Sequence, residues 1–129
     1  MLALEPIDCT RIVGRGAAVS TKISGRAVGV VLAPDELVVV PVDQTTFAVD
    51  APDHCVVESD QGFSGRWMTP SEFGSVVAFH IEWPIPVDRP ASAQGLVAGV
   101  PSKLFFGADE RVLLLCATAY AHELMERLG

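Results

Sequence analysis

Valine-rich runs separated by turn residues fill the first part of the chain. Residues 27–33 (AVGVVLA) and 36–42 (ELVVVPV) flank Pro34-Asp35, a common turn dipeptide. Because the valines are consecutive rather than strictly alternating with polar residues, we expect both faces of these strands to be covered. The two runs therefore predict a buried antiparallel hairpin.

Later apolar runs predict further short strands, at 46–50, 54–59, 75–83, 95–100 and 102–107. Within SVVAFHIEW (75–83), Phe79, Ile81 and Trp83 occupy alternate positions, which is the period of a half-buried strand. Three prolines between residues 84 and 90 remove backbone donors, so regular pairing should stop there.

The C-terminal segment follows a different pattern. Residues 109–128 contain neither proline nor glycine, Asp109 is a suitable N-cap, and Arg127 suits the negative end of a helix dipole. Apolar residues recur at helical spacing. They include Leu113, Cys116, Ala117, Tyr120, Leu124 and Leu128. We therefore expect a helix over 109–128.

Together these elements predict a mainly β (α+β) fold. A β-rich region over residues 10–107 would form a small antiparallel β-barrel or sandwich of seven or eight strands, closed by a C-terminal α-helix. With 129 residues the chain is long enough for one domain with its own core, so we expect a single domain over 1–129.

Charge and cysteine content limit the classes of partner. The net charge is −7 and nine Lys and Arg residues are scattered singly, which argues against nucleic-acid binding. No basic, apolar leader and no apolar run of membrane-spanning length is visible. Three cysteines without CxxC spacing fit reduced thiols, so the expected location is cytoplasmic, without membrane insertion.

Three segments carry a family resemblance. Arg11–Ala18 (RIVGRGAA), Gly29–Val42 (GVVLAPDELVVVPV) and Ser75–Val87 (SVVAFHIEWPIPV) occur in the order of similar segments in trypsin-like serine proteases. Together they resemble the first β-barrel of that family. The resemblance implies a degenerate barrel that descends from a protease.

The catalytic residues of that family are missing from the matching positions. Val42 stands where the resemblance places the catalytic histidine, and Ser75 stands where it places the aspartate. Valine accepts no proton and serine does not stabilise an imidazolium, so the general base and its orienting partner are both lost. The resemblance therefore implies a protein without protease activity.

One serine remains a candidate nucleophile. Asp60–Trp67 (DQGFSGRW) is similar to the nucleophile loop of the same family, although Phe63 replaces its aspartate. Glycines around Ser64 favour a turn, and a structural turn is the simpler interpretation. The alternative is a small serine hydrolase, with Ser64 as nucleophile, His54 as base and Asp50 as its partner.

Metal and cofactor motifs are absent from the sequence. No CxxC or HxxxH pair and no Walker or dinucleotide loop occurs, so we expect no metal and no cofactor. His80 and Glu82 would share one strand face as a surface pair.

The main hypothesis is a non-catalytic protein-interaction domain. The wide apolar face of the expected helix points to self-association as a homodimer or to docking on a protein partner. Exposed aromatic residues in the loop around Ser64 would add contacts. The candidate partner-binding residues are Phe63, Trp67, Met68, Tyr120, Leu124 and Leu128. A barrel that encloses a small ligand is a further alternative.

Overall fold

The computed structural model describes residues 2–41 and 47–129, so Val42, at the histidine position of the resemblance, lies outside the described residues. The chain divides into two compact units. The N-terminal unit is Ile7–Gln61, and the C-terminal unit is Gly62–Gly129 together with the residues up to Pro6. The single-domain expectation stays a prediction.

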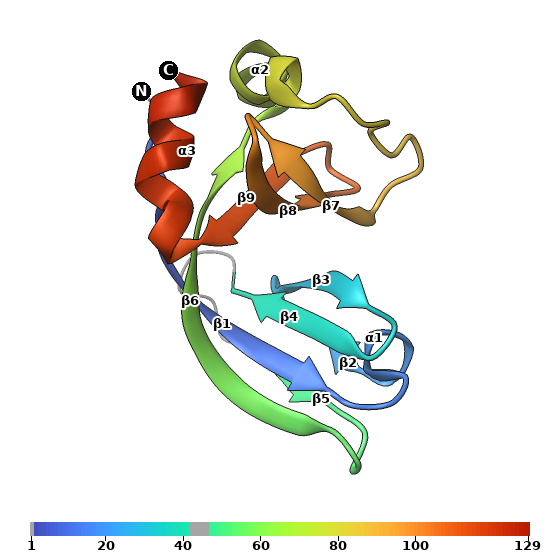
Figure 1. The fold of residues 1–129 in the computed structure, drawn as a ribbon. Helices are drawn as coiled ribbons and strands as arrows, with labels where there is room; N and C mark the ends of the chain where they lie inside the picture. The colour runs from blue at the N-terminus through green and yellow to red at the C-terminus, as the bar shows by residue number, and fades with distance from the viewer. Residues whose placement is uncertain (1, 42–46) are drawn as a thin grey trace. The chain divides into compact units, whose positions relative to one another are not determined.

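The N-terminal unit contains the predicted hairpin. Strands β3 (Val28–Ala33) and β4 (Glu36–Val40) pair antiparallel, and β4 pairs with β1 (Glu5–Val13) on its other side (Figure 1). Val38, Val39 and Val40 are all buried, as expected for a strand covered on both faces. Strand formation starts at Glu5, earlier than the expected residue 10.

Short elements complete this unit. Helix α1 spans Ala17–Ser20, and strands β2 (Lys22–Ile23) and β5 (Val49–Asp50) form a separate two-stranded sheet. A small apolar cluster forms where these elements pack on β1 and β4, with Ile12, Ala17, Leu37 and Val39 at its centre.

Strand β6 (Val56–Met68) begins in the N-terminal unit and ends in the C-terminal unit. There it pairs with β9 (Val112–Ala117), followed by β8 (Val100–Phe106) and the edge strand β7 (Ala91–Val97). Ala98 and Gly99 close the β7–β8 hairpin, both with positive φ (50° and 78°), as a tight two-residue turn requires.

Helical segments cover one face of this sheet. The chain passes from β6 through α2 (Pro70–Glu72), the π-helical turn η1 (Phe73–Val77) and the 3₁₀ turn η2 (Ala78–His80). After β9 it forms the 3₁₀ turn η3 (Thr118–Tyr120) and helix α3 (Ala121–Leu128). Residues from η1, α3 and the alternate positions of β8 and β9 form one core, including Phe73, Val77, Leu104, Phe106, Leu114, Leu124 and Leu128.

The C-terminal helix is confirmed, but its expected start at 109 is wrong. Residues 112–117 form the strand β9 instead, between β6 and β8, and α3 begins only at Ala121. Val112–Cys116 are buried without exception. A run of consecutive apolar residues fits a central strand with two covered faces as well as it fits a helix, so periodicity alone does not separate them.

Two further local expectations are wrong. Residues 75–83 form helical turns and an irregular stretch rather than a strand, so His80 and Glu82 do not share a strand face. The segment around Ser64 is not a turn, because Phe63–Met68 pair in register with β9. Strand pairing therefore holds Gly65, the residue after Ser64, in an extended ladder.

The expected fold class is otherwise confirmed. The chain is mainly β, its strands pair antiparallel, and a helix ends it.

Candidate interaction groove

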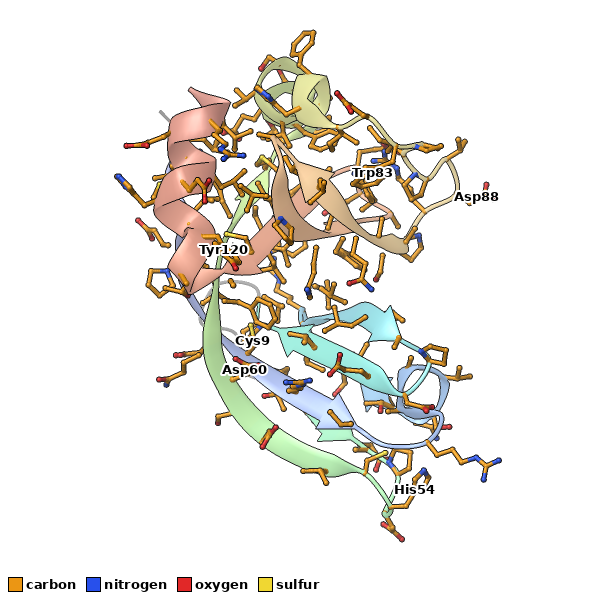
Figure 2. The ribbon with its side chains drawn as sticks, viewed as in Figure 1. Cys9, His54, Asp60, Trp83, Asp88 and Tyr120 are labelled. Atoms are coloured by element: carbon orange, nitrogen blue, oxygen red, sulfur yellow. The ribbon has the colours of Figure 1, made fainter. Side chains whose placement is uncertain are left out.

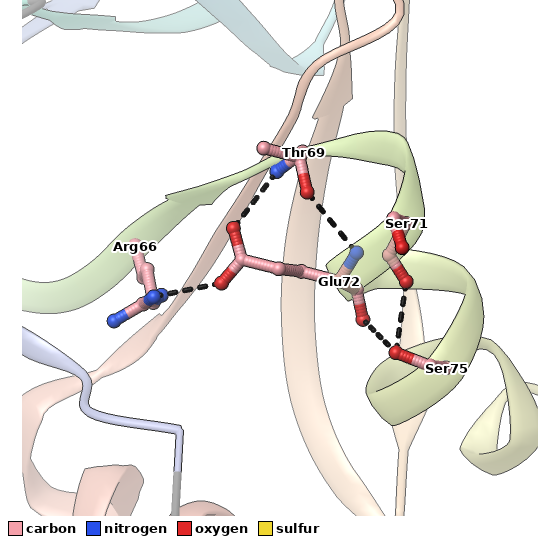
Figure 3. A network of polar contacts seen from close by, with 5 residues as sticks. All are labelled: Arg66, Thr69, Ser71, Glu72 and Ser75. Atoms are coloured by element: carbon pink, nitrogen blue, oxygen red, sulfur yellow. Dashed lines mark hydrogen bonds and ion pairs between the residues drawn. The ribbon is translucent and has the colours of Figure 1, made fainter.

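A capping box begins the helical connection that leads to the candidate site (Figure 3). The Glu72 backbone N–H donates to Thr69 Oγ1 at 3.1 Å, and the Thr69 N–H donates to Glu72 Oε1 at 3.2 Å. Pro70 at the first helical position adds a fixed φ. The remaining carboxylate oxygen of Glu72 accepts from Arg66 Nη2 at 2.7 Å, which ties the connection to β6.

The hydrogen bond from Arg66 and that from the Thr69 backbone lower the pKa of Glu72 below its ordinary value of 4.5. A carboxyl group whose pKa is lower in the folded state stabilises the fold above its unfolded pKa. We therefore expect Glu72→Gln to be less stable than wild type near pH 7. This difference should shrink as the pH falls below about 4.5. Urea unfolding between about pH 3 and pH 7 measures it.

Thr69→Ala is the matched control for this experiment. It removes the hydroxyl acceptor of the same capping box, at a cost of about 1 kcal/mol, and introduces no titrating group. Most of its loss of stability should persist at every pH, because the Thr69 hydroxyl is only the smallest of the causes that lower the pKa of Glu72. A loss for Glu72→Gln that is equally independent of pH would contradict the proposed role of the carboxylate.

A groove of about 520 Å³ opens where the connection meets the β7–β8 turn. It is lined by Phe79, His80, Glu82, Trp83, Leu96, Ala98 and Gly99. Two segments that are distant in sequence thus form its walls, residues 79–83 and residues 96–99.

Hydrogen bonds hold the two walls together. Trp83 Nε1 donates to the carbonyl oxygen of Leu96 at 2.9 Å, and the Ala98 N–H donates to the His80 carbonyl at 3.0 Å. The Trp83 indole also lies against Gly95, where a Cβ atom would be 2.5 Å from Nε1. Both hydrogen bonds end on a backbone carbonyl oxygen, so they fix the main chain of the two walls. The groove is therefore a preformed feature of the C-terminal unit.

Large apolar side chains face solvent at this groove. Phe79 is 80% exposed and Leu96 is 55% exposed, whereas most residues of their size in this unit are buried. Figure 2 labels Trp83 within the connection that precedes β7. Exposed aromatic and aliphatic side chains beside a groove are typical of a surface that binds another protein.

A second groove of about 380 Å³ shares part of this lining. Phe79 and His80 line both grooves, and the second one extends over Arg66, Glu72 and Ser75 toward the end of α3. Phe79 therefore borders both grooves of the C-terminal unit.

The hydrolase candidates have other partners in the structure. Ser64 is 1% exposed, and its hydroxyl lies 3.0 Å from the hydroxyl of Thr118. His54 Nε2 lies 2.6 Å from the carbonyl oxygen of Arg15. Asp50 belongs to β5. Neither hydrogen bond is the serine-to-imidazole bond that activates a nucleophile.

The partner-binding candidates divide into buried and exposed residues. Met68, Leu124 and Leu128 belong to the apolar core of the C-terminal unit, where their packing accounts for their character. Tyr120, in contrast, is exposed.

Phe63 and Trp67 are half-buried and contact cations. Lys103 Nζ lies 5.7 Å from the centre of the Phe63 ring. The guanidinium carbon of Arg111 lies 4.8 Å from the centre of the Trp67 ring. Trp67 also packs edge-on against Phe105. These rings serve packing within the unit, so they offer less contact area than Phe79.

The buried thiols of Cys9 and Cys116 have low reactivity. Burial raises the pKa of Cys9 to about 12, and the nearby carboxylates of Asp60 and Asp8 add to this shift. Figure 2 shows Cys9 and Asp60 on the neighbouring strands β1 and β6. Burial also raises the pKa of Cys116. A protonated thiol is a poor nucleophile and a poor metal ligand.

Two observations concern metals and membranes. Within residues 2–41 and 47–129, no three His, Cys, Asp or Glu side chains gather as a metal site. No helix built from the described residues has the length and apolar character needed to cross a membrane.

The sequence contained one indication of the helical segment at this groove, but the strand prediction over 75–83 did not take it into account. Thr69-Pro70-Ser71-Glu72 matches the capping box pattern of a helix start, and it precedes the alternating residues 75–83. No comparable local signal identifies Leu96 as a groove residue. Its position depends on the hydrogen bond to Trp83.

Comparison with known proteins finds no relative of this chain. The chain matches no protein family, no curated protein and no solved structure.

Proposed function

We propose that this chain is a non-catalytic protein-interaction domain that binds a partner segment in the groove beside Phe79. One observation carries this proposal: Phe79 is 80% exposed at a groove lined by both apolar and polar residues. A phenylalanine side chain has few rotatable bonds, so an exposed one offers contact area at a low cost in conformational entropy. The buried Ser64 hydroxyl and the raised pKa of the Cys9 thiol are consistent with a non-catalytic role.

Selection from a displayed library of short random peptides tests the proposal without a known partner. We expect the wild-type protein to enrich peptides that bind it. Phe79→Ala should weaken their binding about 30-fold, which corresponds to about 2 kcal/mol for a contact that dominates an interface. Its free energy of unfolding should stay close to that of wild type, because an exposed side chain contributes little packing.

Val19→Ala is the matched control, since Val19 is equally exposed but belongs to α1 of the N-terminal unit. This variant should bind the selected peptides as wild type does. A library without enriched peptides, or peptides that bind Phe79→Ala unchanged, would overturn the proposal.

Self-association is measured on the same preparations by light scattering. The expected homodimer stays a prediction. Of the helix residues that suggested it, Leu124 and Leu128 lie in the core of the C-terminal unit, whereas Tyr120 is exposed. A dimer that Phe79→Ala converts to a monomer would make a second copy of the chain the occupant of the groove. The cytoplasmic location and the trypsin-like ancestry also stay predictions.

A further inference from the structure

We infer that the segment bound in this groove carries a lysine or arginine next to a large apolar residue. This inference rests on the proposed function and names the chemistry of the partner. Its first support is Glu82, an exposed carboxylate that lines the groove beside Trp83.

Two arginines near this part of the unit are already paired with acidic groups, and Lys103 lies over the Phe63 ring. Arg127 Nη2 donates to Glu123 on α3, and its Nη1 donates to the Ala98 carbonyl at 2.8 Å. Arg66, at the second groove, pairs with Glu72.

Among the ion pairs of the described residues, none involves Glu82. The groove therefore retains one negative charge that a ligand can neutralise.

The apolar walls suit the rest of a basic side chain. The long stems of lysine and arginine pack on apolar surface while their charged ends stay hydrated, and aromatic faces attract cations. Phe79 and Trp83 supply aromatic surface on either side of Glu82 in sequence. A basic residue can thus place its stem on an aromatic ring and its charge at the Glu82 carboxylate.

The charge of the whole chain favours the same partner. With a net charge of −7, the protein attracts basic segments and repels acidic ones, including a second copy of itself. Charge complementarity therefore selects a basic partner segment over self-association at this groove.

A charge-swap selection tests the inference. The same peptide library is selected on the wild type and on Glu82→Lys. We expect lysine and arginine beside an apolar residue in the wild-type peptides, and aspartate or glutamate at that position in peptides from the variant. Binding of a wild-type peptide to Glu82→Gln should be about 5-fold weaker than to the wild-type protein at low salt, as for an exposed ion pair. Added salt should weaken binding to the wild type and so shrink this difference, because it screens the ion pair that only the wild type forms.

Glu58→Gln is the control for net charge, because Glu58 is exposed on β6 in the N-terminal unit. It should leave the affinity unchanged. Peptides that depend on Phe79 but carry no basic residue, and that bind Glu82→Gln as tightly as wild type, would overturn this inference and leave the proposed function intact. If no Phe79-dependent peptide is found, or if the groove is occupied by a second copy, both the inference and the peptide-binding function fail.

Discussion

Leu124→Ala is expected to lower the free energy of unfolding by about 3 kcal/mol, the loss typical of a buried leucine. Leu124 is 0% exposed and belongs to the core that α3 shares with η1, β8 and β9. Removing its side chain leaves a cavity in this core, because the surrounding strands relax only partly. Urea denaturation followed by circular dichroism measures the change.

Leu124→Met is the matched control, since it keeps the volume and should cost less than about 1.5 kcal/mol. The experiment also separates two roles of α3. If Leu124→Ala stays as stable as wild type while a dimer becomes a monomer, the apolar face of the helix lies between copies of the chain. That result would contradict the core position and restore the helix as the interaction surface.

Gly95→Ala is expected to disrupt the groove and to destabilise the protein by about 2 kcal/mol. A Cβ atom at this position would lie 2.5 Å from Nε1 and 2.7 Å from Cε2 of Trp83. The rigid indole ring must therefore move, and its hydrogen bond to the Leu96 carbonyl is lost. We expect the indole N–H of Trp83, assigned by comparison with Trp83→Phe, to exchange faster with solvent in NMR spectra. Peptides selected on the wild type should bind this variant weakly.

Gly74→Ala is the control for replacing a glycine, because a Cβ atom there meets nothing within 4 Å. Gly74 lies in the helical turn η1, so alanine should be neutral or stabilising by up to about 1 kcal/mol. Unchanged stability and unchanged protection of the Trp83 indole in Gly95→Ala would contradict the close packing of these two residues.

Local patterns were sufficient where turn chemistry and strand composition agreed. The hairpin around Pro34-Asp35 forms as predicted, with β3 and β4 on either side. The runs 95–100 and 102–107 predicted two late strands, and two strands form there, but the break between them was misplaced: the Ala98–Gly99 turn lies inside the first run, and Pro101 lies inside β8. In both hairpins the partner strand lies a few residues away, so the sequence between the strands determines the pairing.

Local patterns failed where the partner is distant. Residues 112–117 are apolar throughout, and only their position between β6 and β8 makes them a strand. The alternation in 75–83 predicted a strand, yet the capping box at Thr69 begins a helical path and no strand pairs with this segment in the described structure. Periodicity indicates which residues can share one face of a strand or helix, but not which distant part of the chain packs on that face.

The sequence by itself determined the mainly β class, the β3–β4 hairpin, the presence of a C-terminal helix and the net negative charge. Only the tertiary structure decided which apolar residues lie inside. It placed Leu124 and Met68 in the core and left Phe79 and Leu96 at the surface. The physical reason is that turns and periodicity are encoded by neighbouring residues, whereas burial depends on long-range pairing. The groove follows from such pairing, because hydrogen bonds from Trp83 to Leu96 and from Ala98 to His80 join two segments that no local pattern connects.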